Sequence, residues 1–434
     1  MSPETIGLIG ITALLVMIFL RAPIGVAMLL VGVMGIWALQ GWSAVNFVSS
    51  TSPVHVLSSD TLSMVPLFLL MGNFALHSGM AGSVYRSANA FVGYFRGGLA
   101  AGTILAAGGF SAICGSSLAT VTTMARISVP EMLRYGYDPK LAAGAVGAGG
   151  TLGILIPPSL LMILYAYITE TSVGRLFAAG IIPGIVAILL YCAAIVIWVS
   201  LDPKIAPHQK RLPFHEQMRT LLDIMAPALV FGIVMGGIFG GFFSPTEGAG
   251  VGAAAVLMIG IAFRTLGPSE IWTSVRETVL ITGMVFLLLI GIDYFNFFME
   301  ASRLPATIEA FFLGLNVPPF ALLMMIILLL VLLGCVLDSI AIVLIMTPFL
   351  YPIISHIGYD LIWFGIVLVM VVEIGLLTPP FGMNVFVINA LVPQITLSEA
   401  FRGVTPFLMA DFVRVGILIA FPPLCLWLPN LLFN

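Results

Sequence analysis

Two helical segments of this chain are broken in the same way, and the breaks expose backbone oxygens that could bind a small cation. Glycines and prolines interrupt an apolar run from Gly149 to Ser159 and a second one from Glu373 to Gly382. Because proline lacks an N–H group and glycine loosens a helix, we predict that carbonyl groups near 150–153 and 375–378 lose their helical partners. A buried carbonyl without a partner needs a cation, a water or a substrate.

Each broken helix follows an apolar segment that has a polar interruption of its own. The segment 97–131 is interrupted at Cys114-Gly115-Ser116-Ser117, and the segment 317–354 at Asp338-Ser339. We predict that each segment is a re-entrant hairpin, because irregular backbone at membrane depth is tolerated only where it is buried in protein or lines a cavity. A continuous span with a kink is the alternative.

The predicted sites are two Na⁺ sites, one beside each hairpin tip, with the substrate between the tips. Carbonyl groups at helix C-termini suit Na⁺, and N–H groups at helix N-termini suit a carboxylate. Alternatively, the Ser and Thr hydroxyls only satisfy backbone groups in kinked helices. The predicted cation ligands are Ser116, Ser117, Gly150 and Gly153 at the first site and Asp338, Ser339, Gly375 and Thr378 at the second. The predicted substrate contacts are Ser116, Ser117, Ser339, Thr378 and Asn384.

Three charged residues lie in apolar surroundings. Asp338 and Glu373 are carboxylates that would each cost roughly 2.5–3.5 kcal/mol at the centre of a bilayer unless compensated. Either could lie near the second cation site, carry a proton, or form a structural hydrogen bond. Arg126 is the deepest positive charge of the first hairpin, and it either attracts an anionic substrate or extends to the interface.

The composition places the whole chain in a lipid bilayer. Of its 434 residues, 60% are hydrophobic and 8% are charged, against about 25% charged in soluble domains. Apolar runs of the roughly 20 residues that cross a bilayer recur along the sequence. The chain has no polybasic tract that would indicate nucleic-acid binding, and its four cysteines are isolated, so neither a disulfide framework nor a zinc site is expected.

The chain is also an internal duplication with an offset of 222 residues. Residues 110–159 align with 332–381 without a gap. The alignment pairs Gly136-Tyr137-Asp138 with Gly358-Tyr359-Asp360, and Pro157-Pro158 with Pro379-Pro380. Such a repeat indicates two copies of one unit, and in membrane proteins this is typical of transporters.

The distribution of positive charge predicts that the two copies are inverted. Arg21 and the basic residues of the polar stretch 202–219 mark the cytoplasmic side, which puts the N-terminus on the periplasmic side. Basic residues surround the first hairpin, whereas no Lys or Arg occurs between Arg303 and Arg402. The first hairpin therefore opens to the cytoplasm and the second to the opposite side, and five spans in each half give the same inverted arrangement.

The predicted fold is an all-α polytopic membrane protein with an inverted-topology repeat, two re-entrant helical hairpins and two discontinuous helices. The hairpins and discontinuous helices would move as one domain against a static scaffold of the remaining spans. In chain order the units are the first repeat 1–201 with hairpin 97–131 and discontinuous helix 140–170, the cytoplasmic connector 202–222, and the second repeat 223–434 with hairpin 317–354 and discontinuous helix 361–392.

These motifs resemble the large, DctM-like membrane subunit of TRAP transporters, the tripartite ATP-independent periplasmic family. The resemblance rests on 149–159, on Gly180–Gly184, on Ser244–Gly250 and on Gly375–Gly382, and it covers essentially the whole chain. Arg126 departs from the family pattern, in which small apolar residues are more usual.

The resemblance implies an elevator-type secondary transporter in a prokaryotic inner membrane. It would import an organic acid, a carboxylate or a sialic-acid-like anion, together with Na⁺. Its implied partners are a periplasmic substrate-binding protein and a smaller four-span membrane subunit, which should be a separate polypeptide.

Three other functions are alternatives to this one. A stand-alone Na⁺/carboxylate symporter would need no binding protein, and uptake by this chain alone would favour it. An intramembrane hydrolase would need a Ser–His or paired-Asp arrangement, but the repeat partner of Asp338 is Ser116. A non-transporting scaffold would not explain the duplicated helix breaks, so we predict a transporter and no enzyme activity.

Overall fold

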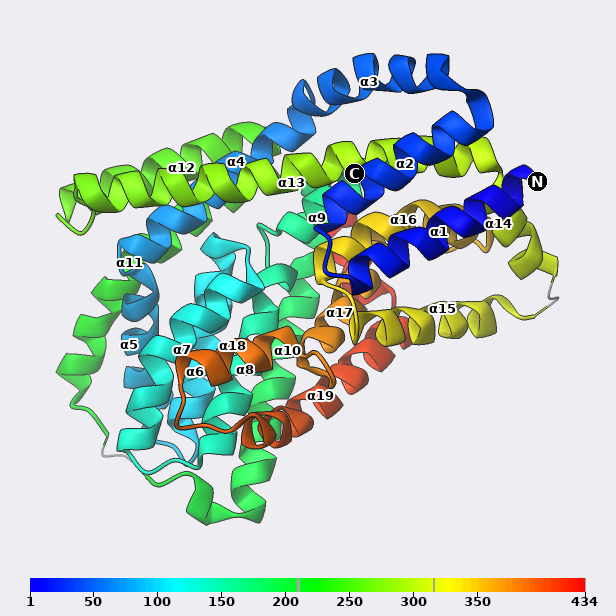
Figure 1. Ribbon diagram of the computed structural model, residues 1–434. Coiled ribbons are helices and arrows are strands. Elements are labelled where there is room, and N and C mark those ends of the chain that lie inside the picture. The colour runs from blue at the N-terminus through cyan, green and yellow to red at the C-terminus, as the bar shows by residue number, and fades with distance from the viewer. Residues whose placement is uncertain (209–210, 315–316, 434) are drawn as a thin grey trace.

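The computed structural model describes residues 1–208, 211–314 and 317–433, and the regular elements of that part of the chain are helices (Figure 1). The first half contains α1 (Pro3–Phe19), α2 (Ile24–Gln40), α3 (Trp42–Leu57), α4 (Asp60–His77), α5 (Met80–Val92), α6 (Gly98–Cys114), α7 (Ser117–Arg134), α8 (Pro139–Leu155), α9 (Leu160–Thr169) and α10 (Val173–Leu201). The second half contains α11 (Phe214–Phe239), α12 (Pro245–Ala262), α13 (Pro268–Ser302), α14 (Leu304–Gly314), α15 (Pro319–Gly334), α16 (Ser339–His356), α17 (Leu361–Leu377), α18 (Met383–Leu391), α19 (Leu397–Ala420) and α20 (Pro423–Leu432). Within the described ranges, seven helices are long and apolar enough to cross a membrane, or eight if α3 and α4 form one bent span. The predicted all-α polytopic membrane protein is thus confirmed.

The duplication read from the sequence is visible in the order and length of the helices. Helices α7 and α16 both have 18 residues, α8 and α17 both have 17, and each pair begins 222 residues apart. Helices α3 and α4, bent by 51° at a short break, occupy the place that the single long helix α13 has in the second copy. The polar residues of 49–57 lie within α3, which is helical through Leu57.

The connector between the halves is shorter than predicted. Helix α11 begins at Phe214, inside the predicted connector 202–222, and a 3-10 turn covers Pro203–Ile205. Residues 209–210 of the connector lie outside the described residues. The proline before Phe214 supplies the extended residue that precedes the helix.

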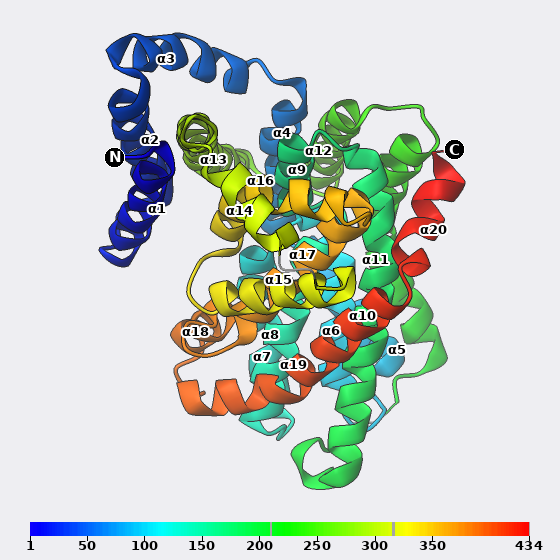
Figure 2. The same cartoon turned by 90° about the vertical axis from the view of Figure 1, so that its right-hand side faces the viewer.

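Helices α1–α5 and α11–α14 form an outer group. Helix α2 packs along α13, and α4 packs along both α12 and α13. Glycines permit these approaches: a Cβ atom on Gly32 of α2 would lie 2.7 Å from the backbone carbon of Tyr294 in α13. Helix α3 lies across one edge of the molecule between α2 and α4, and both views show it there (Figures 1 and 2).

Helices α6–α10 and α15–α20 form an inner group that contains both broken helices. Each copy contributes to the other: α9 packs on α16, and its repeat equivalent α18 packs on α7. Helix α19 crosses α8 where Gly403 faces Gly144, and a Cβ atom on either glycine would collide with the backbone of the other helix. Such an exchange of equivalent contacts indicates a two-fold relation between the copies.

The crossing of α8 and α19 provides a test of this packing. We expect Gly403→Leu to lower the free energy of unfolding by about 1–3 kcal/mol, because a side chain there overpacks the crossing. Thermal unfolding of the purified protein in detergent measures the effect. Gly416→Leu on the same helix, where no atom lies within 4 Å of the added Cβ, should leave the transition unchanged. Equal effects of the two substitutions would contradict the close crossing.

Candidate functional site

The segment 97–131 forms a helical hairpin of α6 and α7. Gly115 adopts a left-handed conformation (φ +65°), which a glycine accommodates without steric cost, and Ser116 is extended. The Ser116 hydroxyl accepts from Ala119 N at 3.4 Å and so caps α7. At the other end, Leu99 N donates to the Tyr137 hydroxyl at 3.3 Å, so both ends of the segment lie on the same side of the molecule.

The tip of this hairpin rests on the first broken helix. A Cβ atom on Gly153 would lie 2.6 Å from Ser116 O and 2.8 Å from Ser117 Cα, and one on Gly115 would lie 2.5 Å from Pro158 O. Only residues without a side chain permit this contact. The predicted association of the first tip with the first break is therefore observed, with Ser116, Ser117 and Gly153 together.

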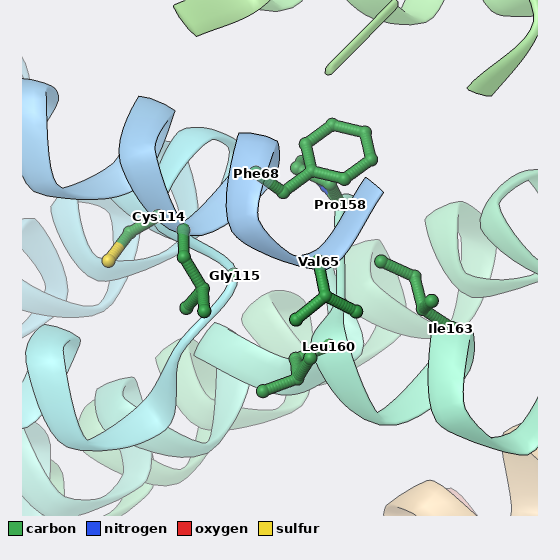
Figure 3. Close-up of a pocket in the computed structure, with 8 residues that line it drawn as sticks. Val65, Phe68, Cys114, Gly115, Pro158, Leu160 and Ile163 are labelled. Atoms are coloured by element: carbon green, nitrogen blue, oxygen red, sulfur yellow. The ribbon is translucent and has the colours of Figure 1, made fainter. Parts of the chain in front are cut away.

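Side chains from two other helices enclose the tip. Figure 3 shows Val65 and Phe68 of α4, and Leu160 and Ile163 of α9, around Gly115. The cavity between them measures about 10 Å³, enough for roughly one water molecule. The tip is thus closely packed in this conformation.

The break lies at the C-terminal end of the predicted range. Helix α8 continues through Gly150 and Gly153 to Leu155, so of the carbonyls predicted near 150–153 to lose their helical partners, only that of Gly153 does. Pro157 and Pro158 lack N–H groups, and the carbonyls left without i+4 donors are therefore those of Gly153 and Ile154. The Ser159 hydroxyl donates to Ile154 O at 2.5 Å, which leaves the Gly153 carbonyl without its helical donor.

Asn384 of the second copy joins the first hairpin to the first broken helix. Its side-chain oxygen accepts from the Ser117 hydroxyl at 3.2 Å, and its amide nitrogen donates to Gly147 O at 3.3 Å. Asn384 is 1% exposed, and its Nδ2 lies 3.2 Å from the position of a Cβ on Gly150. Asn384, predicted as a substrate contact, therefore lies among the residues predicted for the first cation site.

The second hairpin meets the second broken helix differently. Gly375 of α17 touches Gly334, one turn before the tip, rather than Ser339. Asp338 is exposed, and its carboxylate accepts from Ile340 N at 3.2 Å as the N-cap of α16. The Ser339 hydroxyl is buried and has no hydrogen-bond partner in the described part of the chain. The Thr378 hydroxyl donates to Ile374 O at 2.6 Å. It thus satisfies a backbone carbonyl, which is the alternative to cation binding given above for the Ser and Thr hydroxyls.

An apolar cavity lies on one side of the second hairpin. A cavity of about 690 Å³ lies between α15 and α16 and extends to α1 and α14, with an apolar lining that includes Phe311, Leu329 and Phe349. In the first copy the equivalent helices are in contact, since a Cβ on Gly109 of α6 would lie 2.9 Å from Val84 of α5. The copies thus share a fold but differ in how their hairpins are seated.

Sequence reasoning missed the partner of Glu373. This carboxylate is fully buried and lies 2.9 Å from Arg414 Nη2, which also lies 2.9 Å from Asp411 Oδ1. The spacing of Asp411 and Arg414 on one apolar span was the available signal. Arg126, in contrast, is exposed, as expected of a side chain that extends to the surface.

The chemistry available at the first tip is that of neutral oxygen ligands. The Ser117 hydroxyl and the Asn384 amide oxygen meet there, beside Gly153, and such hard oxygen donors suit cations of the Na⁺ type. The described residues contain no group of three or more His, Cys, Asp or Glu side chains that could hold a metal ion.

Comparison with known proteins gives a consistent family. The family model described as tripartite ATP-independent periplasmic transporter, DctM component, matches residues 11–424. The C4-dicarboxylate TRAP transporter large permease protein DctM of Pseudomonas aeruginosa is 36% identical, with 85% of this chain and 86% of that protein covered. The sialic acid TRAP transporter large permease protein SiaM of Vibrio cholerae is 31% identical over 96% of both chains. The ectoine TRAP transporter large permease protein TeaC of Halomonas elongata is 32% identical, with 86% of this chain and 87% of that protein covered.

A solved structure shares the fold. The Alcanivorax borkumensis YdaH transporter superposes with a TM-score of 0.62 over 89% of this chain and 91% of its own, at 16% sequence identity. At this identity the likeness concerns the fold alone.

Labelling of Cys114, which is 7% exposed at the hairpin tip, tests how the tip is seated. We expect Gly153→Ala to raise the rate at which a thiol reagent modifies Cys114 by about tenfold, because the added methyl group displaces Ser116 and Ser117. The other three cysteines are first replaced by alanine.

The matched control is Gly236→Ala in the same background. It adds the same methyl group to a helix position with no atom within 4 Å. If Gly153→Ala labels no faster than Gly236→Ala, the tip does not rest on this glycine.

Proposed function

Because the chain belongs to the tripartite ATP-independent periplasmic (TRAP) transporter family as its DctM component, we propose that it is the large permease subunit of a Na⁺-coupled importer of an organic anion. Membership of this family makes it a transporter subunit rather than an enzyme. The observation that supports the proposed site most directly is the convergence of Ser117, Gly153 and Asn384 at the first hairpin tip.

The substrate class follows from the relatives and from the polarity of the site. The relatives are named for C4-dicarboxylates, sialic acid and ectoine. A carboxylate could accept hydrogen bonds from the N–H groups at the start of α7, where the partial positive charge of the helix lies. The proposed substrate is therefore a small carboxylate-bearing molecule, held by Ser116 and Ser117 of the first tip, by Ser339 and Thr378 of the second copy, and by Asn384.

The coupling ions are proposed to be two Na⁺, one for each repeat. The first would be held by Ser116, Ser117, Gly150 and Gly153. The Gly153 carbonyl has no i+4 donor, because that position is Pro157, which lacks an N–H group. The second would be held by Asp338, Ser339, Gly375 and Thr378. The buried Ser339 hydroxyl without a partner supports a ligand at that position.

Movement is proposed to follow an elevator mechanism between inverted repeats. The exchanged contacts of α9 with α16 and of α18 with α7 support the two-fold relation. The sequence-based prediction left α10 and α19 in the static scaffold. We propose instead that they belong to the moving domain with the hairpins, because they pack against α8 and α17. The cavity beside the second hairpin, where the equivalent helices α5 and α6 of the first copy touch, supports a conformation in which the two hairpins are seated differently.

The proposed setting is a prokaryotic inner membrane with the N-terminus in the periplasm. The tripartite family implies a periplasmic substrate-binding protein and a small four-span membrane subunit as partners. Exposed apolar side chains on the outer helices α1, α2 and α13, such as Met34, Trp37 and Met284, would contact lipid or the small subunit.

Replacing external Na⁺ by choline tests the coupling. In proteoliposomes that contain this chain with its small subunit and binding protein, uptake of the bound substrate should fall to the leak of empty vesicles. Undiminished uptake in choline would contradict Na⁺ coupling. Full uptake without the binding protein would instead indicate a stand-alone symporter.

Substitution of Asn384 tests the site. We expect Asn384→Ala to lower uptake at least tenfold, about 1.4 kcal/mol of lost interaction, because it removes the link between Ser117 and Gly147. The matched control is Asn389→Ala on the same helix, whose amide donates to Ile395 O away from the tip. Similar uptake by the two variants would contradict a role for Asn384 in the site.

A further inference from the structure

A buried cluster of charged and hydroxyl groups joins the two broken helices, and its central acid, Asp411 of α19, is none of the proposed Na⁺ ligands. Its members come from four helices, and each is 0% exposed. Thr151 of α8 and Glu373 of α17 are repeat equivalents, 222 residues apart, and they stand at the two ends of the cluster. Between them lie Tyr191 of α10 and the pair Asp411 and Arg414 of α19.

The contacts form one continuous chain. Arg414 Nη2 lies 2.9 Å from both Glu373 Oε2 and Asp411 Oδ1. Asp411 Oδ1 also lies 2.6 Å from the Tyr191 hydroxyl oxygen, which in turn lies 3.0 Å from Thr151 Oγ1. Thr151 donates to Ala148 O at 2.8 Å within α8.

The charges of this cluster do not balance when both acids are ionised. Two carboxylates and one guanidinium leave a net charge of −1 in a fully buried site. The titratable and charged groups that contact Asp411 are Tyr191 and Arg414, with Glu373 joined through Arg414. Burying an uncompensated charge is strongly unfavourable, and one bound proton would remove it. Asp411 Oδ2 and Glu373 Oε1 are buried without a hydrogen-bond partner in the described part of the chain.

The hydroxyl protons give the same count independently. Three contacts, from Thr151 to Ala148, from Thr151 to Tyr191 and from Tyr191 to Asp411, each require one proton. The Thr151 and Tyr191 hydroxyls supply two. If Tyr191 donates to an ionised Asp411 and Thr151 donates to Ala148, no proton remains between the two hydroxyl oxygens.

We propose that this cluster is a proton-binding site and that the proton resides on the Asp411 carboxyl group. Asp411 then donates to Tyr191, Tyr191 donates to Thr151, and Thr151 donates to Ala148, while Arg414 pairs with an ionised Glu373. Every contact has one proton, and the net charge of the cluster is zero. The bound proton makes the packing of α19 against both broken helices depend on protonation of a single acid.

Infrared spectroscopy of the full-length protein in nanodiscs tests the proposal at neutral pH. We expect Asp411→Asn to remove one band of a protonated carboxylic acid from the C=O stretching region. The asparagine amide can still donate to Tyr191, so the variant should fold, as its thermal unfolding will show. The control Asp202→Asn changes an exposed carboxylate and should remove no such band.

A second variant locates the proton. Tyr191→Phe removes the acceptor of the Asp411 proton and should shift the same band to higher frequency. If Asp411→Asn removes no band, Asp411 carries no proton and the proposal is wrong. If the band is present but insensitive to Tyr191→Phe, Asp411 does not donate to Tyr191, which also contradicts the proposal. Neither result depends on transport, so the outcome is independent of the proposed Na⁺ coupling.

Discussion

The structure depends on one constraint: a backbone carbonyl at membrane depth must have a partner within the protein. Two prolines in succession break this condition at the end of α8 and again at the end of α17, because each removes an N–H group. The hydroxyls of Ser159 and Thr378 satisfy one carbonyl at each break, those of Ile154 and Ile374. The tip of the first hairpin rests on Gly153, next to the first of these breaks.

Duplication makes this arrangement possible, because neither copy is complete alone. Asn384 reaches from the second copy to Ser117 and Gly147 of the first, and α9 of the first copy supports α16 of the second. The equivalence is nevertheless not exact in conformation. The first tip meets its broken helix at Ser116 and Ser117, whereas the second meets it at Gly334, beside an apolar cavity of about 690 Å³. The two similar hairpins therefore pack differently against their broken helices in one molecule.

Charge in the interior is concentrated away from the tips. The neutral oxygens of the first tip suit a hard cation that must also be released, since weak neutral ligands do not hold it permanently. The buried ionisable groups instead lie in the cluster of Glu373, Asp411 and Arg414, where they link α17 and α19 and extend through Tyr191 to α8. Such a buried network fixes the relative positions of helices when all of its members are satisfied.

The sequence alone determined the membrane location, the duplication, the helix breaks and the family. Each of these depends on local composition, on short motifs or on a pattern that repeats at a fixed offset. It also predicted that Ser116, Ser117 and Gly153 would lie together, since the tip and the break interrupt neighbouring apolar segments. It began the set of unpartnered carbonyls too early, because a helix tolerates Gly150 until the prolines remove its donors. It could not find the pairing of Glu373 with Arg414, which are 41 residues apart, or the position of Asn384 beside Gly147. Those contacts depend on how α17, α18 and α19 cross α8, and only the tertiary packing decides which side chains of crossing helices meet.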